Sequence, residues 1–494
     1  MLLQVGTGKF GVTGQMVLTS NSDVDITAAE PAPVLPALDG SAFPPYIKVF
    51  QNGECTRNDG RAHPVPGGGG TTLIDPDKIC FSCFRVPTIL AGQTPGVIHA
   101  FAEARRGELN SGKNSSISGA GGCPDGPDTR LVYKRSTDYG ATWGSLTVFL
   151  QNPRARAENG LCQSQAAPVI DPVTKTLFVG FTLNLPGCQA SALNSTDYAV
   201  TPALVQSTDD GLTWSQPYDL MLNMGPDKPP VPAGQRNITG GVFGPTKGLT
   251  IQRPDGSVRL QLPGEADWSA SVFSDDHGHS WQSNALNRNY TLSPGEMDWT
   301  VCSKGTACPP GMKFIMVSRA AGRGCPTMCV QFSADGVVWS PKIATVNSDN
   351  LNIGQGHAKP GIVAVPGAFI SSQTLLLCPR GVRMNSDFSC GTPGSPSYRK
   401  REPSDVLGNG MCLMISRDGV HWSLFKKTWP IGGMYTTVAG LSFDADGAAL
   451  RYGVVFAGGS LPWDRSGHIY YMNFTAVHAN GTMDAELARA IAKL

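Results

Sequence analysis

The sequence predicts an all-β protein built as a β-propeller. A nine-residue polar segment that contains tryptophan occurs as STDYGATWG from Ser136 and again as STDDGLTWS from Ser207. Between its copies, short apolar runs alternate with turn residues. Glycine (59 residues) and proline (38 residues) are abundant, which favours many short strands and turns over long helices.

Three regions follow one another along the chain. Residues 1–42 are expected to form an N-terminal extension, because they end in the proline-rich AAEPAPVLPALDG. Residues 43–475 contain short apolar runs such as GVIHAFAEA, TLFVGFTL and KFIMVSR, whose lengths and spacing predict buried, mostly antiparallel strands. Residues 476–494 form a C-terminal tail, in which TMDAELARAIAKL is the one convincing helical stretch.

The repeated segment predicts how the strands are grouped. A third copy, SDDHGHSWQ, starts at Ser274, and two shorter copies read SADGVVW and SRDGVHW. The aspartates at the same place in each copy are 59 to 83 residues apart, which leaves room for one four-stranded sheet per repeat. Sheets that recur in this way are typical of a propeller, where radial repetition protects the sheet edges. The five aspartates are Asp138, Asp209, Asp276, Asp335 and Asp418.

The chemistry of this turn predicts a structural role. Its aspartate and serine side chains can hydrogen-bond the backbone of their own hairpin, glycine supplies positive φ, and tryptophan packs beneath. We therefore expect each copy to clip the outer hairpin of one blade, and we do not expect these aspartates to be catalytic.

Composition excludes several classes of partner. The net charge is +1, from 39 Lys and Arg against 38 Asp and Glu, which provides no electrostatic attraction for nucleic acid or a membrane surface. No apolar run reaches the length of about 18 residues expected of a membrane span.

Cysteines and sequons predict an oxidising compartment. Thirteen cysteines indicate disulfides, and the odd number leaves at least one free or intermolecular thiol. Cys80 and Cys83 form a lone C-x-x-C pair without a second pair at zinc-ribbon spacing, so no metal site is expected. No signal peptide is evident in the opening MLLQVGTGKFGVTGQ. Six sequons fit a secreted or lysosomal glycoprotein: Asn114, Asn194, Asn237, Asn289, Asn473 and Asn480.

Further motifs resemble one enzyme family. The repeated turn is similar to the Asp box of the exo-α-sialidases, or neuraminidases. The segment FRVPTIL, from Phe84, resembles the family's Phe/Tyr-Arg-Ile-Pro signature with valine in place of isoleucine. AFAEARRG, GPTKGLTI and LPGEADWSASVFSDDHGHSW follow in the family's order. The resemblance extends over residues 80–460 and implies a six-bladed propeller that hydrolyses terminal α-linked sialic acids.

Arginines are the expected ligands of the substrate. Sialic acid carries a carboxylate on its anomeric carbon, and a planar guanidinium can bind both carboxylate oxygens at once. The family uses three arginines, and the resemblance assigns the first to Arg85 and the second to Arg319. Two residues remain candidates for the third. Arg383 lies in LLLCPRGVRMN, which resembles a family segment, whereas Arg401 lies nearer the family's usual interval from Tyr435.

The resemblance also implies the reacting groups. Asp125, in CPDGPDTR, is the expected acid for the leaving oxygen, and Asp128 is the alternative. Tyr435, in GGMYTTVAGL, is the expected nucleophile, since a neutral hydroxyl avoids the repulsion that a second carboxylate would meet at the anomeric carbon. Glu296, in SPGEMDW, is the expected partner of Tyr435, with Asp298 as the alternative.

Other features complete the predicted site. Glu296 precedes Arg319 by more than the family's usual interval, which fits an inserted loop that Cys302 and Cys308 could close. Glu103 is expected to orient Arg85 or Arg105, and Arg105 to line the pocket near the acid.

The expected function is therefore hydrolysis, with retention, of sialic acids on glycoproteins, glycolipids or oligosaccharides, without a cofactor. Transfer of sialic acid to another sugar remains an alternative, as does a propeller that binds sialic acid without cleaving it.

Overall fold

The computed structural model of the protein describes a little over half of the chain. The described residues are 12–13, 46–55, 81, 83–105, 129–148, 162–185, 199–215, 217–220, 242–253, 255–265, 272–283, 296–319, 325, 328–347, 352–353, 359–376, 409–429, 433–445, 447–458 and 468–494.

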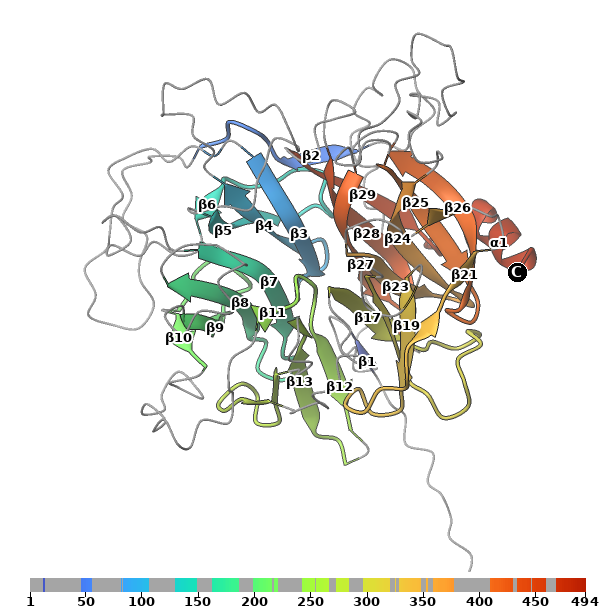
Figure 1. The fold of residues 1–494 in the computed structure, drawn as a ribbon, viewed down its shortest axis with the longest axis horizontal. Helices are drawn as coiled ribbons and strands as arrows, with labels where there is room; N and C mark the ends of the chain where they lie inside the picture. Colours follow the sequence, from blue (N-terminus) through green and yellow to red (C-terminus); the bar gives the residue numbers. More distant parts are fainter. Residues whose placement is uncertain are drawn as a thin grey trace, which may run out of the picture.

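In the described part of the chain, seven sheets form six blades around a central axis, two of the sheets making up blade 3, so the predicted six-bladed propeller is confirmed (Figure 1). Neighbouring strands within a blade are antiparallel, apart from one short parallel pair in the fifth blade. Blade 1 consists of β3 (Cys83–Ala91), β4 (Ile98–Arg105), β5 (Thr129–Ser136) and β6 (Thr147–Val148). Blade 2 consists of β7 (Cys162–Ile170), β8 (Leu177–Leu185), β9 (Ala199–Ser207) and β10 (Tyr218–Asp219).

Blade 3 is interrupted near the axis. Residues 244–248 separate β11 from β12, and Pro263 separates β13 from β14, so that β11 pairs with β14 and β12 pairs with β13. Its strands are β11 (Val242–Phe243), β12 (Leu249–Gln252), β13 (Val258–Leu262), β14 (Gly264–Glu265), β15 (Val272–Ser274) and β16 (Gln282–Ser283). The two residues of β1 (Val12–Thr13) pair with β12. Blade 4 consists of β17 (Met297–Val301), β18 (Phe314–Ser318), β19 (Cys329–Ser333) and β20 (Ile343–Ala344).

The last two blades lie near the chain's C-terminal end. Blade 5 consists of β21 (Val346–Asn347), β22 (Asn352–Ile353), β23 (Gly361–Val365), β24 (Ala368–Leu376), β25 (Asn409–Ser416) and β26 (His421–Trp429). Blade 6 consists of β27 (Gly433–Phe443), β28 (Ala449–Gly458), β29 (His468–Thr475) and the N-terminal β2 (Ile47–Phe50). Because β2 pairs with β29, the two ends of the propeller are joined by backbone hydrogen bonds within one sheet.

The hydrophobic core is divided into layers between adjacent blades. One layer joins Phe84 and Ile89 of blade 1 to Val455 and Tyr471 of blade 6. Corresponding layers lie between the other neighbouring pairs of blades, with blade 4 packed against both blade 3 and blade 5. Each blade therefore depends on its neighbours to bury its two apolar faces.

The Asp-box turns clip the outer hairpins as predicted. In the second copy, Asp209 Oδ1 accepts hydrogen bonds from the Thr213 and Leu212 backbone N–H groups, at 2.8 and 3.1 Å. Ser207 Oγ accepts from the Gly211 N–H at 2.8 Å, and Gly211 has a φ of 86°. The other copies repeat this pattern of serine and aspartate acceptors.

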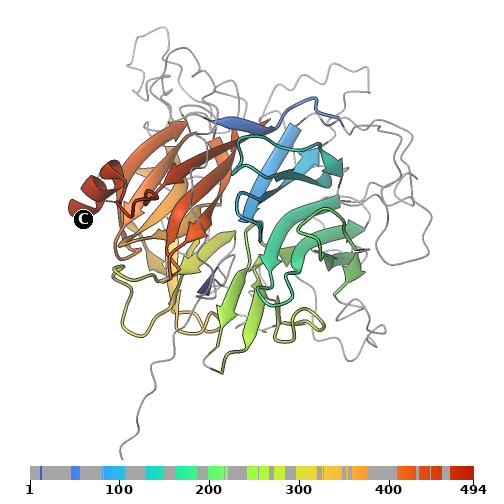
Figure 2. The ribbon, with the colours of Figure 1, turned by 180° about the vertical axis from the view of Figure 1, so that it is seen from behind.

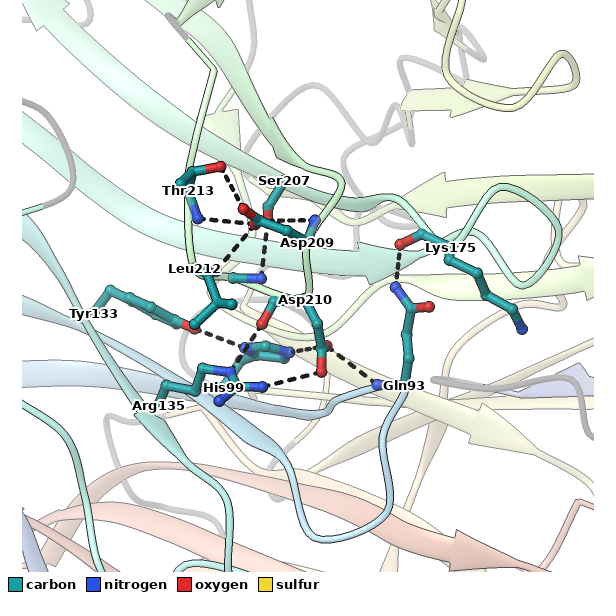
Figure 3. Close-up of polar contacts among 11 residues, drawn as sticks. Gln93, His99, Tyr133, Arg135, Lys175, Ser207, Asp209, Asp210, Leu212 and Thr213 are labelled. Atoms are coloured by element: carbon teal, nitrogen blue, oxygen red, sulfur yellow. Dashed lines mark hydrogen bonds and ion pairs between the residues drawn. The ribbon is translucent and has the colours of Figure 1, made fainter. Parts of the chain in front are cut away.

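The same turns also bind the preceding blade, which the sequence analysis did not predict. Asp210 reaches His99 Nε2 at 3.0 Å and Arg135 Nη2 at 3.3 Å, both in blade 1 (Figure 3). His99 Nδ1 lies 2.9 Å from the Tyr133 hydroxyl. In the third copy, His277 occupies the matching position and contacts Asp171 of blade 2 at 2.8 Å. The fourth residue of these boxes therefore fastens one blade to the next.

The remaining predictions of architecture concern cysteines and the helix. The predicted disulfide Cys302–Cys308 is present, and a second joins Cys325 to Cys329. The predicted C-terminal helix is α1 (Ala485–Ala492), capped by Asp484, and it lies on the outer side of blade 5 (Figure 2). Among the described residues, no helix is long and apolar enough to cross a membrane.

Candidate active site

Three innermost strands carry a β-bulge, and each bulge contains a residue that is unusual for its backbone conformation. Val86 in β3, Gln165 in β7 and Tyr435 in β27 have positive φ values of 52°, 63° and 41°. The strand register shifts at each of these places. A non-glycine residue held in this region is strained, and bulges that re-aim side chains occur often beside active sites. The bulges therefore mark the centre of the ring as the candidate site.

Glu296 joins two of the predicted site residues. The Tyr435 hydroxyl donates to Glu296 Oε1 at 3.0 Å, and Arg319 Nη1 donates to Glu296 Oε2 at 2.7 Å. Each carboxylate oxygen thus has a different partner. Tyr435 belongs to blade 6 and the other two to blade 4, so the contact is made across the face of the ring rather than between neighbouring blades.

The blade 4 ladder fixes the pairing of Glu296 with Arg319. Met297 of β17 lies opposite Ser318 of β18, and the Arg319 N–H donates to the Glu296 carbonyl at 2.9 Å. This bond extends the antiparallel ladder by one residue beyond the two strands. Cross-strand partners project from the same face of a sheet, so the two side chains meet as a direct consequence of the register.

Arg85 completes this group from blade 1. Its guanidinium carbon lies 5.2 Å from the centroid of the Tyr435 ring, within the range of a cation–π contact. Blades 1 and 6 are neighbours where the ring closes, and the bulges at Val86 and Tyr435 lie on their inner strands. Glu296 and Arg85 therefore contact the tyrosine, and Arg319 contacts Glu296.

The charges and exposure of the group favour binding of an anion and transfer of a proton. Glu296 is 8% exposed and accepts a charge-assisted bond, whereas the Arg319 side chain is 25% exposed and remains accessible. The Tyr435 hydroxyl is within direct proton-transfer distance of the carboxylate. The arrangement is suited to binding a carboxylate beside a tyrosine that can lose its proton.

Glu103 pairs with Arg105 rather than with Arg85 through its side chain. The Arg105 Nη2–Glu103 Oε2 distance is 2.5 Å, although Arg85 lies opposite Glu103 in the β3–β4 register. The Gln165 N–H donates to the other Glu103 oxygen at 3.2 Å. Gln165 was not predicted from the sequence, where the only signal is a polar residue next to the apolar AAPVI.

Asp298, the alternative partner of Tyr435, has a different environment. It is fully buried, and its Oδ1 accepts from Lys247 Nζ at 2.6 Å. Glu296 is the acidic residue that receives the Tyr435 hydrogen bond.

Three predicted site residues lie outside the described part of the chain, namely Asp125, Arg383 and Arg401, as does the alternative acid Asp128. Their roles stay predictions. Within the described residues, no group of three or more His, Cys, Asp or Glu side chains could hold a metal ion.

Comparison with known proteins shows which propellers this chain resembles. No family model matches the chain. A curated sialidase of Micromonospora viridifaciens is 26% identical over 285 residues, which are 52% of this chain and 39% of the relative. The structure of Trypanosoma rangeli sialidase aligns with a TM-score of 0.50 and 16% identity, over 90% of this chain and 60% of that one. A mutant of that sialidase displaying trans-sialidase activity aligns with a TM-score of 0.50 and 15% identity, over the same shares of the two chains.

The chain has a sialidase-like propeller fold.

The chain spans 39% of the curated relative and 60% of each of the two solved chains. Structural likeness at 15–16% identity shows a shared fold and assigns no residue a role. The candidate site therefore rests on the contacts among Tyr435, Glu296, Arg319 and Arg85 in this sialidase-like propeller.

Proposed function

We propose that the protein is an exo-α-sialidase that releases terminal α-ketosidically linked sialic acids with retention of configuration. Its substrates would be sialylated glycoproteins, glycolipids or oligosaccharides. One observation carries the proposal: Glu296 accepts from the Tyr435 hydroxyl with one oxygen and from Arg319 with the other. A potential nucleophile, its base and a carboxylate-binding group are thereby linked through a single side chain.

Arginines bind the substrate carboxylate in this proposal. Arg319 is partly exposed beside Glu296, and Arg85 lies against the Tyr435 ring, so both can approach an anion held over the tyrosine. Each charge-assisted contact contributes about 1.5–3 kcal/mol. Arg383 or Arg401 supplies the third guanidinium.

Tyr435 is the proposed nucleophile because it is neutral before it reacts. A carboxylate nucleophile would be repelled by the carboxylate on the anomeric carbon, whereas a hydroxyl is not. As the Tyr435 oxygen bonds to the anomeric carbon, its proton passes to Glu296. The bond to the leaving oxygen breaks, and that oxygen takes a proton from Asp125.

The second half of the reaction reverses these steps. Asp125 removes a proton from water, the water oxygen bonds to the anomeric carbon, and the Tyr435–carbon bond breaks. Tyr435 recovers its proton from Glu296. Two inversions give net retention, and the chemistry needs neither a metal nor a cofactor.

The test is hydrolysis of an α-sialoside followed by proton NMR. We expect free sialic acid to appear first as the α anomer, and we expect Tyr435→Phe to abolish its release. Initial formation of the β anomer would contradict the retaining mechanism. Failure of the wild type to cleave both an aryl sialoside and sialyllactose would overturn the proposed activity, and binding without cleavage would indicate the non-catalytic alternative.

Transfer to a sugar is the second candidate. The fold is shared with a Trypanosoma rangeli sialidase mutant displaying trans-sialidase activity, which supports considering the same site for transfer. Incubation of an aryl sialoside with lactose distinguishes the two. Sialyllactose as the main product indicates a transferase, whereas free sialic acid at high lactose concentration indicates a hydrolase.

We also propose a secreted or lysosomal location. Disulfides Cys302–Cys308 and Cys325–Cys329, and the bonded state of Cys55 and Cys83, are typical of an oxidising compartment. Mass spectrometry of disulfide-linked peptides from the native protein tests this, and fully reduced thiols at these positions would contradict it.

Two sequons differ in their accessibility. The Asn480 side chain is exposed, whereas the Asn473 amide donates to the Tyr139 carbonyl at 3.3 Å. We therefore propose that Asn480 carries a glycan and that Asn473 does not. Glycopeptide mapping tests both sites, and a glycan on Asn473 with none on Asn480 would contradict this assignment.

A further inference from the structure

A buried ion pair lies beside the proposed base. Asp298 and Lys247 are 0% and 2% exposed, and Lys247 Nζ donates to Asp298 Oδ1 at 2.6 Å. The Thr246 hydroxyl donates to the same oxygen at 2.6 Å. Burial lowers the pKa of Lys247, and the charge of Asp298 opposes this effect. The mechanism proposed above does not use either residue.

Backbone contacts extend the pair over three blades. The Asp298 carboxylate also accepts from the backbone N–H groups of Trp299 and Ile362, each at 2.9 Å. Lys247 Nζ donates a second bond to the Ile362 carbonyl at 3.1 Å. Lys247 belongs to the interruption in blade 3, Asp298 to β17 of blade 4, and Ile362 to β23 of blade 5. The pair therefore fixes the position of β17 relative to both neighbouring blades.

The backbone connects Glu296 closely to the Asp298–Lys247 pair. Glu296 lies two residues before Asp298, and successive residues in a strand alternate between faces, so both side chains project from the same face. Their Cα atoms are about 6.6 Å apart at the usual rise per residue. The Glu296 carbonyl accepts from the backbone N–H of Arg319, which directly follows β18, and β17 begins at the residue after Glu296.

Stability alone does not account for the pair. A buried ion pair loses the hydration of two charges, and apolar residues of similar volume often stabilise a fold as well or better. Four donors on one carboxylate instead hold a strand in a defined place, two residues from the base.

We propose that the Asp298–Lys247 pair is a positioning unit for Glu296: it fixes the Glu296 carboxylate between Tyr435 and Arg319, and its two opposite charges offset each other. The inference rests on the proposed function of the site. Neither residue contacts the substrate. Each acts through Glu296.

Other charged groups near Glu296 also influence the pH profile of activity. Arg319 comes from the end of β18, Tyr435 from β27, and Arg85 from β3 against the tyrosine ring. Lys359 precedes β23, and its Nζ donates to Thr437 Oγ1 at 2.8 Å, two residues from Tyr435. The described parts of β1, β18 and β23 themselves contain no titratable side chain. The variants below leave all of these groups unchanged.

The two single variants are expected to shift the acid limb of the pH profile of kcat/KM in opposite directions. Asp298→Asn removes a negative charge and leaves the ammonium of Lys247 uncompensated, so the limb moves to lower pH. Lys247→Met leaves the Asp298 carboxylate uncompensated, so the limb moves to higher pH. We expect shifts of roughly half a pH unit or more. We also expect kcat to fall by about tenfold or more, with KM changed less than about threefold, because the base is displaced.

The double variant and a control separate this role from a general loss of structure. Asp298→Asn with Lys247→Met removes both charges and is expected to restore the wild-type limb. Thr250→Val removes another buried bond between blades, from Thr250 Oγ1 to the Ile170 carbonyl, and is expected to lower Tm without moving the limb. Folded single variants with the wild-type limb, or with shifts in the same direction, would overturn the inference.

Two further outcomes are distinguishable. If a single variant does not fold, Thr246→Val removes one neutral donor to Asp298, and we expect a severalfold lower kcat at an unchanged limb. An unchanged kcat in Thr246→Val would then overturn the inference. A wild type without sialoside hydrolysis would overturn the proposed function, whereas an active wild type with unaffected variants would overturn this inference alone.

Discussion

The hydroxyl of Tyr435 and the carboxylate of Glu296 are 3.0 Å apart, although their blades are separated in the ring by blade 5. Side chains of non-neighbouring blades can meet only over the centre of a propeller. The contact therefore places the candidate site at the axis, where the bulges of three inner strands also lie.

Arg319→Lys is expected to raise KM for a sialoside at least tenfold. A point-charge ammonium cannot reproduce the two-oxygen contact of a guanidinium, and it also weakens the bond to Glu296. Steady-state kinetics test this against Arg259→Lys, which alters an ion pair with Asp275 in blade 3, away from the site. Equal KM values in the two variants would remove Arg319 from the binding role.

The KM values of Arg383→Ala and Arg401→Ala for a sialoside are expected to show which residue is the third arginine. Loss of one charge-assisted contact costs about 1.5–3 kcal/mol, so the variant that lacks the true ligand should show a tenfold or larger rise in KM. The other variant should resemble the wild type. Small and equal effects would mean that neither residue binds the carboxylate.

Much of the fold was predictable because its signal is local. The serine, aspartate and glycine of each Asp box bind within one hairpin, so a short segment such as Ser207–Thr213 contains these interactions. The spacing of the copies then predicted the blades. The Cys302–Cys308 disulfide closes a short loop and was predictable for the same reason.

The contacts between blades were not predictable because they join residues distant in the sequence. Asp210 meets His99 across 111 positions, and nothing in the local pattern of either residue indicates the other. The position of Gln165 depends on a bulge, and the sequence around it contains no glycine that would mark one. The resemblance to sialidases nominated both Glu296 and Asp298, and only the three-dimensional contacts separate them.

The Asp box is expected to affect stability without affecting catalysis. Asp209→Ala removes turn bonds and should cost about 1 kcal/mol in the free energy of unfolding. Gly211→Ala should cost more, about 2–4 kcal/mol, because φ is 86° and an added Cβ would overlap Tyr133 and His99 of blade 1.

Gly256→Ala is the matched control for Gly211→Ala. Gly256 has a φ of 85° but nothing within 4 Å of an added Cβ, so it reports the backbone strain alone. Urea unfolding and kcat/KM of all three variants test the account. Equal destabilisation by Gly211→Ala and Gly256→Ala would contradict the close packing of Gly211 against Tyr133 and His99 of blade 1. A specific loss of activity in Asp209→Ala would contradict the structural role of Asp209.

Acidification is expected to destabilise the fold through His99. Burial lowers the pKa of His99, and the nearby Asp210 opposes this effect. The unfolded chain therefore binds a proton below about pH 6.5 that the native state does not bind, and stability falls as the pH decreases, by up to about 1.4 kcal/mol per pH unit.

His99→Gln should reduce this slope. Burial also lowers the pKa of His468, to about 4, so part of the slope should remain in the variant. Calorimetric Tm values between about pH 7.5 and 5 provide the measurement. A wild-type Tm that rises on acidification, or an identical slope in the variant, would contradict the buried, neutral state of His99.

The central claim is that Tyr435 forms the covalent intermediate with the sialic acid. A 2,3-difluorinated sialic acid tests it directly, because fluoride is a good leaving group and the remaining fluorine slows hydrolysis of the adduct. After incubation, intact mass and peptide mapping should place one added sugar on the peptide that contains Tyr435. Tyr435→Phe should remain unmodified with an unchanged Tm. An adduct on Glu296 or Asp125, or no adduct in a preparation that hydrolyses sialosides, would contradict the account.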